Sequence, residues 1–100
     1  MTTIDPTEIS FFCHIGAMNE YPNLSEAIAI VLEQQRRKRG ITKSALADFA
    51  CLDRRYLREI EVGTKKPTVN AIFFLCDALD FSPIEFFTLV CERLKHMGKQ

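Results

Sequence analysis

The sequence predicts an all-α protein, a bundle of five to six short helices. Apolar residues recur at spacings of three and four, which is the period of an amphipathic helix. Proline and glycine stand where helices would begin or end, and no segment shows the alternating pattern of a strand. One hundred residues, 47% of them hydrophobic, are enough for one small domain with a single core.

The first two helices are expected before residue 40. A short helix can run from Pro6 to Ala17, because proline is well tolerated at the first helical position. Pro22 then interrupts the chain, since a residue that precedes proline is pushed out of helical geometry. The next helix spans about residues 25–39, with Ser25 as its cap and Gly40 as its stop signal.

Four further helices follow, each preceded by a polar residue that can cap its N-terminus. They are expected at about residues 43–50, 54–62, 69–79 and 83–95, with Thr42, Asp53 and Thr68 as caps of the first three and Ser82-Pro83 opening the last. In the first of them, the apolar residues expected to face inward are Leu46, Phe49 and Ala50.

The chain divides into an N-terminal extension with a short helix (residues 1–23), a helical domain whose last helix is extended (24–95) and a short tail (96–100). Its longest uncharged apolar run, Ala27 to Leu32, is too short to cross a bilayer. The first ten residues lack the basic start and apolar stretch of a secretion signal. We therefore expect a cytoplasmic protein.

The cysteines do not indicate a metal site. Cys13, Cys51, Cys76 and Cys91 are widely spaced, with no pair two residues apart. Cys76 and Cys91 fall among apolar residues, where cysteine packs as a small hydrophobe. We expect no metal and no cofactor.

Catalysis is not expected either. Cys13 and its neighbour His14 would point in different directions on a helix, and His96, near Cys91, stands close to the chain end. The sequence also lacks an acid pair and a phosphate-binding loop. An enzyme is therefore the least favoured class.

The positive charge is gathered in the middle third of the chain. Residues 1–33 carry five acidic residues and no lysine or arginine, whereas residues 34–66 carry ten basic and four acidic residues. The net charge of the whole chain is nevertheless zero. Such a cluster is typical of a surface that binds a polyanion, although a solvated basic face without a partner would look the same.

Two charged residues stand on otherwise apolar helical faces. Arg36 continues the row of Ile28 and Leu32, and Glu61 follows Leu57 by four residues. Because an unpaired buried charge is costly, we expect Arg36 and Glu61 to form a structural ion pair.

The segment from Ile41 to Gly63 reads as two short helices joined by a tight turn. The second carries Arg54, Arg55 and Arg58 on the side away from its apolar residues. A short helix with such groups on its outer face is what the major groove of DNA admits.

Residues 28–86 resemble the Cro/C1-type (XRE-like) helix-turn-helix family of DNA-binding regulators. The fold that this implies is lambda-repressor-like. The stretch LDRRYLREIE also resembles, more weakly, the recognition helices of restriction–modification controller proteins. The residues that carry the family resemblance are Arg36, Gly40-Ile41-Thr42, Leu46-Ala47, Tyr56-Leu57, Ile60-Glu61, Gly63, Pro67, Ile72 and Ala78-Leu79.

The resemblance implies double-stranded DNA as the partner and assigns roles to individual residues. The helix Arg54–Val62 would enter the major groove, where arginine pairs with guanine O6 and N7. Glu59 could accept from a cytosine amino group or orient a neighbouring arginine, and both alternatives stay open. The implied base-contacting residues are Arg54, Arg55, Arg58 and Glu59. The implied phosphate-contacting residues are Thr42, Lys43, Tyr56, Lys65 and Lys66, with Tyr56 mainly packing and its hydroxyl within reach.

Three residues depart from the family pattern. Cys51 stands in the turn where glycine is usual, so the backbone there either adopts the needed conformation at some cost or differs. Lys43 replaces a common glutamine, which would make its phosphate contact electrostatic. Asp80 replaces a common glycine, and aspartate tolerates that backbone conformation better than most residues.

The C-terminal third is unusually apolar, which allows two interpretations. Its apolar residues could cover the core and the N-terminal helix, or they could form a two-fold dimer interface that pairs two reading heads on a roughly palindromic site. The candidate interface residues are Phe74, Ile84, Phe87, Val90, Cys91 and Leu94. The favoured function is a homodimeric transcriptional repressor. The alternative is an antitoxin-like module that binds DNA and holds another protein through its N-terminal or C-terminal apolar surface.

Overall fold

The computed structural model describes residues 21–98, which form five helices and no strand. The predicted helix at residues 6–17 lies outside the described residues. None of the helices in the described part is long and apolar enough to cross a membrane. The helices are α2 (Leu24–Lys38), α3 (Lys43–Phe49), α4 (Arg54–Glu61), α5 (Val69–Ala78) and α6 (Pro83–Gly98).

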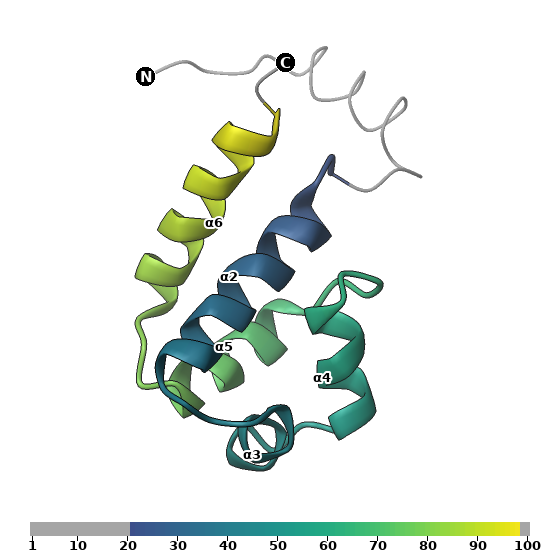
Figure 1. Cartoon of the computed structure of the whole chain (residues 1–100), viewed down its shortest axis with the longest axis vertical. Coiled ribbons are helices and arrows are strands. Elements are labelled where there is room, and N and C mark those ends of the chain that lie inside the picture. Colours follow the sequence, from purple (N-terminus) through teal and green to yellow (C-terminus); the bar gives the residue numbers. More distant parts are fainter. Residues whose placement is uncertain (1–20, 99–100) are drawn as a thin grey trace.

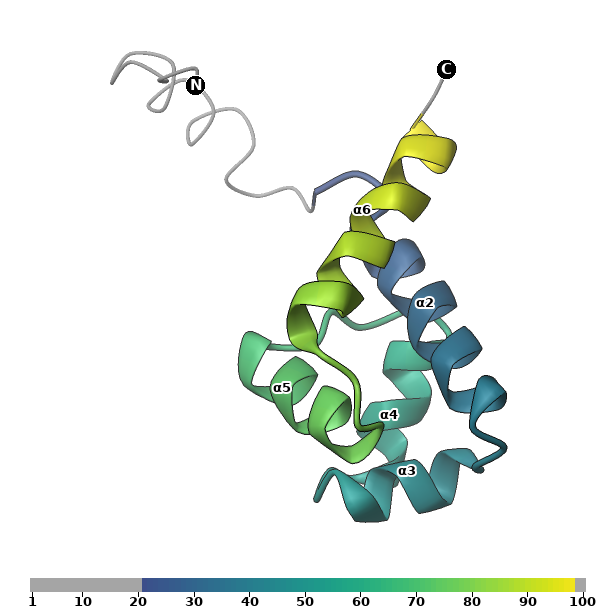
Figure 2. The ribbon, with the colours of Figure 1, turned by 90° about the vertical axis from the view of Figure 1, so that its left-hand side faces the viewer.

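The two longest helices, α2 and α6, pack along one another, and the three shorter helices gather at one end of this pair (Figure 1). Helix α2 also packs on α4, and α3 packs on both α4 and α5 (Figure 2). The all-α prediction is confirmed, and the motif expected at residues 41–63 is formed by α3 and α4.

One hydrophobic core joins all five helices. Each helix contributes side chains that are almost fully buried, which is how amphipathic helices of this length are stabilised. The largest of these side chains are Leu32, Leu46, Leu57, Ile60, Leu75, Leu79, Phe86 and Val90.

Most of the predicted caps are present. The side chains of Thr42, Asp53 and Thr68 accept hydrogen bonds from the backbone N–H groups of Ala45 (3.0 Å), Tyr56 (3.2 Å) and Ala71 (3.0 Å). The prediction of Ser25 as a cap is wrong, because α2 begins at Leu24 after Asn23, whose φ of 65° is left-handed.

Four consecutive helices end in the same motif. In each, a residue with positive φ follows the last turn, and its own N–H and that of the next residue donate hydrogen bonds to carbonyls of that turn. The positions are Gly40 (φ 68°), Cys51 (58°), Gly63 (84°) and Asp80 (54°). Cys51 and Asp80 therefore adopt the backbone that glycine adopts more cheaply, and the turn geometry is kept.

Two apolar positions differ from the prediction. Phe49 is 64% exposed, because the buried face of α3 runs through Leu46 and Ala50 and a one-residue step turns a side chain by about 100°. Cys91 is exposed for the same reason, since the buried row of α6 contains its neighbour Val90. Helix α6 also continues to Gly98, beyond the predicted end near residue 95.

Candidate nucleic-acid interface

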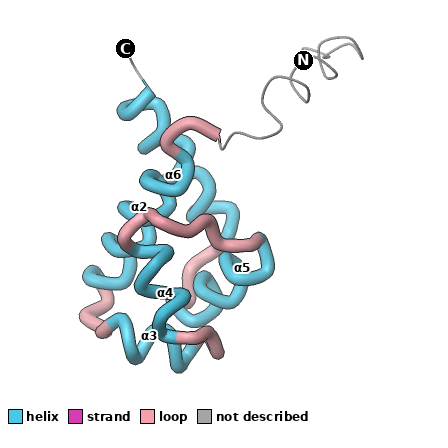
Figure 3. The backbone as a smooth tube through the Cα atoms, turned by 90° about the vertical axis from the view of Figure 1, so that its right-hand side faces the viewer, coloured by secondary structure: helices cyan, strands magenta, loops and turns pink. Residues whose placement is uncertain are grey.

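The turn between α3 and α4 is held from both sides. The N–H groups of Cys51 and Leu52 bond to the carbonyls of Asp48 (3.2 Å) and Ala47 (2.9 Å), which closes the end of α3. Asp53 then caps α4, so the two helices are joined by only four residues, 50–53 (Figure 3). A turn with all of these bonds leaves little freedom in the angle between the helices.

The inner face of α4 anchors it to the core. Leu57 and Ile60 are fully buried, and Glu61 is 7% exposed. The motif is thus attached to the bundle by one side, which leaves its other side for solvent or a partner.

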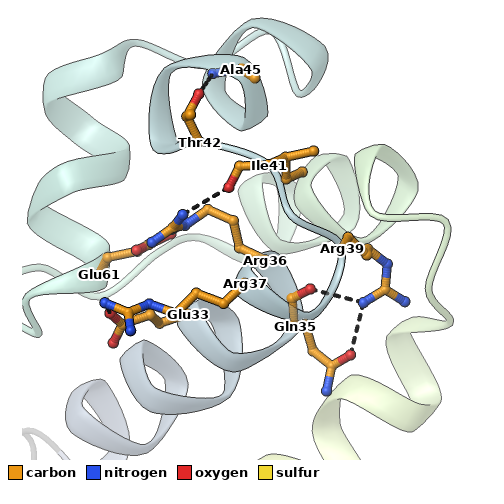
Figure 4. A network of polar contacts seen from close by, with 9 residues as sticks. All are labelled: Glu33, Gln35, Arg36, Arg37, Arg39, Ile41, Thr42, Ala45 and Glu61. Carbon is orange, nitrogen blue, oxygen red and sulfur yellow. Dashed lines mark hydrogen bonds and ion pairs between the residues drawn. The ribbon is translucent and has the colours of Figure 1, made fainter.

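Arg36 ties the end of α4 to two other parts of the chain. Its Nε lies 2.8 Å from a carboxylate oxygen of Glu61, and its Nη1 donates to the carbonyl of Ile41 at 2.8 Å (Figure 4). The predicted Arg36–Glu61 pair is therefore present and buried. The second carboxylate oxygen of Glu61 is buried without a hydrogen-bond partner among the described residues. This contact locks α4 to α2 and to the segment that leads into α3.

The outer face of α4 presents three exposed arginines in different surroundings. The guanidinium of Arg54 lies 3.2 Å from the carboxylate of Asp48 on α3, and Nε of Arg55 lies 3.6 Å from the carboxylate of Glu59 one turn later. Arg58 has no carboxylate within ion-pair distance in the described part of the chain. All three guanidinium groups are therefore available on one exposed face.

Glu59 joins the arginines to the lysines that follow α4. Its two carboxylate oxygens lie 3.6 Å from Nε of Arg55 and 3.3 Å from Nζ of Lys65, and its side chain is 31% exposed. A carboxylate already engaged with two cations has less capacity to accept from a base. Glu59 was expected either to accept from a cytosine amino group or to orient a neighbouring arginine. These two contacts favour the second role.

Four of the five expected phosphate-contacting residues flank the α4 arginines in the sequence, and Tyr56 lies among them. Thr42, Lys43 and Lys66 are exposed at the start of α3 and after α4. The Tyr56 ring is partly buried, its hydroxyl accepts from the Thr68 N–H at 3.2 Å, and Nζ of Lys65 lies 5.9 Å from the ring centroid. The Tyr56 hydroxyl keeps its own proton to donate.

Helix α5 and the start of α6 carry four exposed apolar side chains, which together we call the α5–α6 patch. It consists of Val69 (65% exposed), Phe73 (54%), Phe74 (45%) and Ile84 (79%). Sequence reasoning named Phe74 and Ile84 but missed Val69 and Phe73. Their spacing of four residues on α5 could have indicated this, because residues four apart lie on the same face of a helix.

One of the candidate interface residues belongs to the core, and two others pack partly against it. Val90 is 2% exposed, so its assignment to an interface is wrong. Leu94 and Phe87 are partly buried against the core, and the Phe87 ring lies edge-on to Phe86 with centroids 5.6 Å apart. The physical reason is that α6 uses the row Phe86, Val90 and Leu94 to pack on the bundle, which places Cys91 outside.

The three cysteines of the described residues differ in burial. Cys76 is buried in α5, and burial raises its pKa to about 11 because the thiolate loses hydration. Cys51 and Cys91 are exposed. Within residues 21–98, no group of three or more His, Cys, Asp or Glu side chains is placed to hold a metal ion.

The chain is similar to known helix-turn-helix proteins. A family model described as helix-turn-helix matches residues 32–86. YqaF of Bacillus subtilis (strain 168), an HTH-type transcriptional regulator, is 35% identical over 68 residues, which cover 68% of this chain and 90% of YqaF.

Solved structures give the same result for the fold. The restriction–modification controller protein C.AhdI from Aeromonas hydrophila is 31% identical with a TM-score of 0.62, and the match covers 67% of this chain and all of C.AhdI (100%). The controller protein C.Esp1396I, solved as a tetramer on its 35 base-pair operator, is 27% identical with a TM-score of 0.67. That match covers 75% of this chain and 97% of C.Esp1396I.

Proposed function

The chain belongs to the Cro/C1-type helix-turn-helix family of transcriptional regulators, and we propose that it is a sequence-specific repressor that binds DNA as a homodimer in the cytoplasm. In this proposal residues 24–95 form the DNA-binding domain, and the activity is binding rather than catalysis. The operator complex of C.Esp1396I supports DNA as the partner.

The observation that carries the proposal is the contrast between the two faces of α4. The inner face is locked by buried apolar residues and the Arg36–Glu61 pair, whereas the outer face exposes Arg54, Arg55 and Arg58. A rigidly held helix can place guanidinium groups at defined positions in the major groove, and each bidentate contact to guanine contributes about 1–3 kcal/mol of discrimination.

Within this proposal, Arg54, Arg55 and Arg58 contact base edges. Glu59 orients Arg55 and Lys65 rather than reading a base itself. Thr42, Lys43, Lys65, Lys66 and the Tyr56 hydroxyl contact phosphates, which adds affinity without sequence preference.

The homodimer is supported by the α5–α6 patch. Three large apolar side chains of this patch, Phe73, Phe74 and Ile84, are each about half exposed or more, and covering them would remove apolar surface from water. A second copy would cover the patch through the same residues on both subunits, which is the geometry of a two-fold axis. Two recognition helices would then lie one helical turn apart, about 34–36 Å, on a roughly palindromic site.

Selection of bound sequences from random double-stranded DNA tests the function. We expect enrichment of a half-site repeated with inverted symmetry, with its centres about 10 base pairs apart. Equal binding to all sequences would contradict a sequence-specific regulator. An enriched single half-site would contradict the homodimer alone.

A second candidate is an antitoxin-like module, which the exposed aromatic residues Phe73 and Phe74 also suit. In that case a different protein covers the α5–α6 patch. Purification from cells that express the chain at its natural level discriminates the two, because a stoichiometric second protein would replace the second copy.

A further inference from the structure

Asp48 is a carboxylate on an otherwise cationic surface. Residues 34–66 carry ten basic and four acidic residues, and three of the acidic ones have evident tasks. Asp53 caps α4, Glu61 pairs with Arg36, and Glu59 pairs with Arg55 and Lys65. Asp48 caps no helix, and an unneeded carboxylate beside DNA phosphates would only weaken binding. Its side-chain contact therefore indicates its task.

That contact crosses the helix-turn-helix turn. The Asp48 carboxylate accepts a hydrogen bond from Nη2 of Arg54 at 3.2 Å, and the two side chains are 59% and 63% exposed. The backbone of Asp48 is held as well, because its carbonyl accepts from the Cys51 N–H at 3.2 Å. The backbone that carries this carboxylate is thus fixed. Asp48 lies near the end of α3, across the turn from Arg54, which is the first residue of the recognition helix α4.

We propose that Asp48 is a positioning residue that holds the Arg54 guanidinium in one orientation and so determines which base pair Arg54 reads. The inference rests on the proposed function. Guanidinium has five N–H donors, so one bond to Asp48 leaves enough donors for the two acceptors of a guanine.

The same pair contributes little to the stability of the free protein. Exposed ion pairs are worth at most about 1 kcal/mol, because water screens them. In the groove the water is displaced, and an arginine that is already oriented loses less side-chain freedom on binding. Arg58, which has no carboxylate partner among the described residues, lacks this preorganisation. Asp48 therefore acts on recognition rather than on folding.

The test is Asp48→Asn in the full chain, because asparagine keeps the shape and removes the charge. The site selected by the unaltered protein and its single-base-pair variants are titrated with both proteins. We expect the preference at one base pair to fall roughly 5- to 10-fold, part of the discrimination of one bidentate contact. Binding to unselected DNA should stay equal or strengthen, since a negative charge has been removed.

Asp80→Asn is the matched control. Asp80 is also exposed, has no ion pair within residues 21–98, and occupies a left-handed position that asparagine tolerates. Its substitution should leave the base preference unchanged, and Asp48→Glu, which keeps a carboxylate, should restore part of the preference that Asp48→Asn loses.

A double-variant cycle with Arg54→Ala shows whether Asp48 acts through Arg54. In the Arg54→Ala background, Asp48→Asn should cause no further loss of preference. An equal loss in both backgrounds, or an unchanged profile in Asp48→Asn, would overturn the inference and leave the proposed function standing. An unaltered protein that selects no sequence at all would overturn both.

Discussion

Glu59 and Glu61 stand two residues apart on α4, and each faces an arginine, yet their surroundings are opposite. Glu61 is 1% exposed in its side chain and lies 2.8 Å from Nε of Arg36. Glu59 is 31% exposed and lies 3.6 Å from Nε of Arg55, whose side chain is 80% exposed. One pair joins two helices inside the bundle, and the other lies on the surface proposed to meet DNA.

The difference shows that burial decides what such a pair does. A buried pair contributes modestly as a pair, but removal of one partner leaves a costly uncompensated charge. An exposed pair can be broken at almost no cost, so its arginine remains available for a ligand. The inner pair therefore defines where the helix lies, whereas the outer pair orients its guanidinium and leaves further N–H donors for a ligand.

Arg36→Met, which removes the cation of the buried pair, should reduce stability more than any other substitution proposed here. It leaves the Glu61 carboxylate buried without its cation, and we expect the free energy of unfolding to fall by about 3–5 kcal/mol. Urea denaturation followed by circular dichroism measures this.

Arg37→Met is the control for the inner pair, because Arg37 pairs with Glu33 at 2.8 Å but is 72% exposed. It should change stability by less than about 0.5 kcal/mol. The combination of Arg36→Met with Glu61→Leu should recover most of the loss, since both charges are gone. Equal losses in Arg36→Met and Arg37→Met would refute the role of burial.

Phenylalanine extends the comparison to apolar residues. Phe86 is 1% exposed and fills the core, whereas Phe73 is 54% exposed in the α5–α6 patch. Phe73→Glu should weaken a homodimer by about 2–4 kcal/mol, the range of an interface hot spot, while the monomer stays folded. Sedimentation at micromolar concentration should then change from twice 11.5 kDa to 11.5 kDa.

Phe49→Glu provides the control for the patch, because Phe49 is 64% exposed but lies on α3. Its sedimentation should match that of the unaltered chain. A monomeric unaltered chain at the same concentration would remove the dimer from the proposal.

Separate replacement of Arg55 and Lys66 distinguishes base contacts from phosphate contacts on the surface proposed to bind DNA. Arg55→Ala should relax the preference at one base pair by about 1–3 kcal/mol, because a directional contact is lost. Lys66→Ala should weaken binding to all sequences alike and reduce the salt dependence by about one released ion. Titrations at several salt concentrations separate the two, and an equal loss of base preference in both variants would argue against the assignment.

Cys51→Gly tests the backbone strain in the turn between α3 and α4, which sets the orientation of α4. Cys51 has a φ of 58°, which costs an L-residue roughly 1–2 kcal/mol. Glycine removes this cost but loses more chain entropy on folding, so a net stabilisation of about 0.5–1 kcal/mol is expected.

The same substitution at Cys91, an exposed residue inside α6, should destabilise by about 1 kcal/mol. Thermal unfolding of both variants should show a higher melting temperature for Cys51→Gly and a lower one for Cys91→Gly. A destabilising Cys51→Gly would show that the thiol makes a contribution beyond backbone geometry.

The last effect concerns the buried thiol, and it is absent at neutral pH. Burial raises the pKa of Cys76 to about 11, above the value near 8.5 of an unfolded cysteine. Between these values the unfolded state releases a proton that the folded state keeps, so stability should fall as the pH rises from about 8.5 to 11.

Alkylation followed by mass spectrometry measures, at neutral pH, how accessible each of the three thiols is in the native protein. Cys51 and Cys91 should react in the native protein, because both are exposed, and Cys76 only after unfolding. Rapid modification of Cys76 under native conditions would mean that α5 opens locally.

Most local signals were read correctly from the sequence, although Ser25 does not cap α2 and α6 ends later than predicted. Thr42, Asp53 and Thr68 cap helices, and Gly40 and Gly63 end them, because these effects depend on neighbours within one turn. The Arg36–Glu61 pair was also predictable, although it joins residues 25 apart. Two opposite charges on apolar stripes have few other ways to avoid an unpaired burial.

Faces at the margin of the core were read less well. Phe49 was placed inside and is exposed, and Val90 was placed at an interface and is buried. Cys91 was named both as a small packing residue and as an interface candidate, and it is exposed. A one-residue step turns a helical side chain by about 100°, and an apolar sequence does not say which of two adjacent rows meets the neighbouring helix.

The sequence by itself determined the five helices of residues 21–98, most of their ends, the helix-turn-helix motif and the arginines of its second helix, because each follows from the chemistry of nearby residues. Only the tertiary structure decided which exposed charged side chains are partnered and which apolar side chains stay exposed. It placed Asp48 against Arg54 and Glu59 between Arg55 and Lys65, and it left Val69 and Phe73 uncovered in the monomer. The physical reason is that such contacts depend on how whole helices pack, and packing is decided by the shape of the entire core.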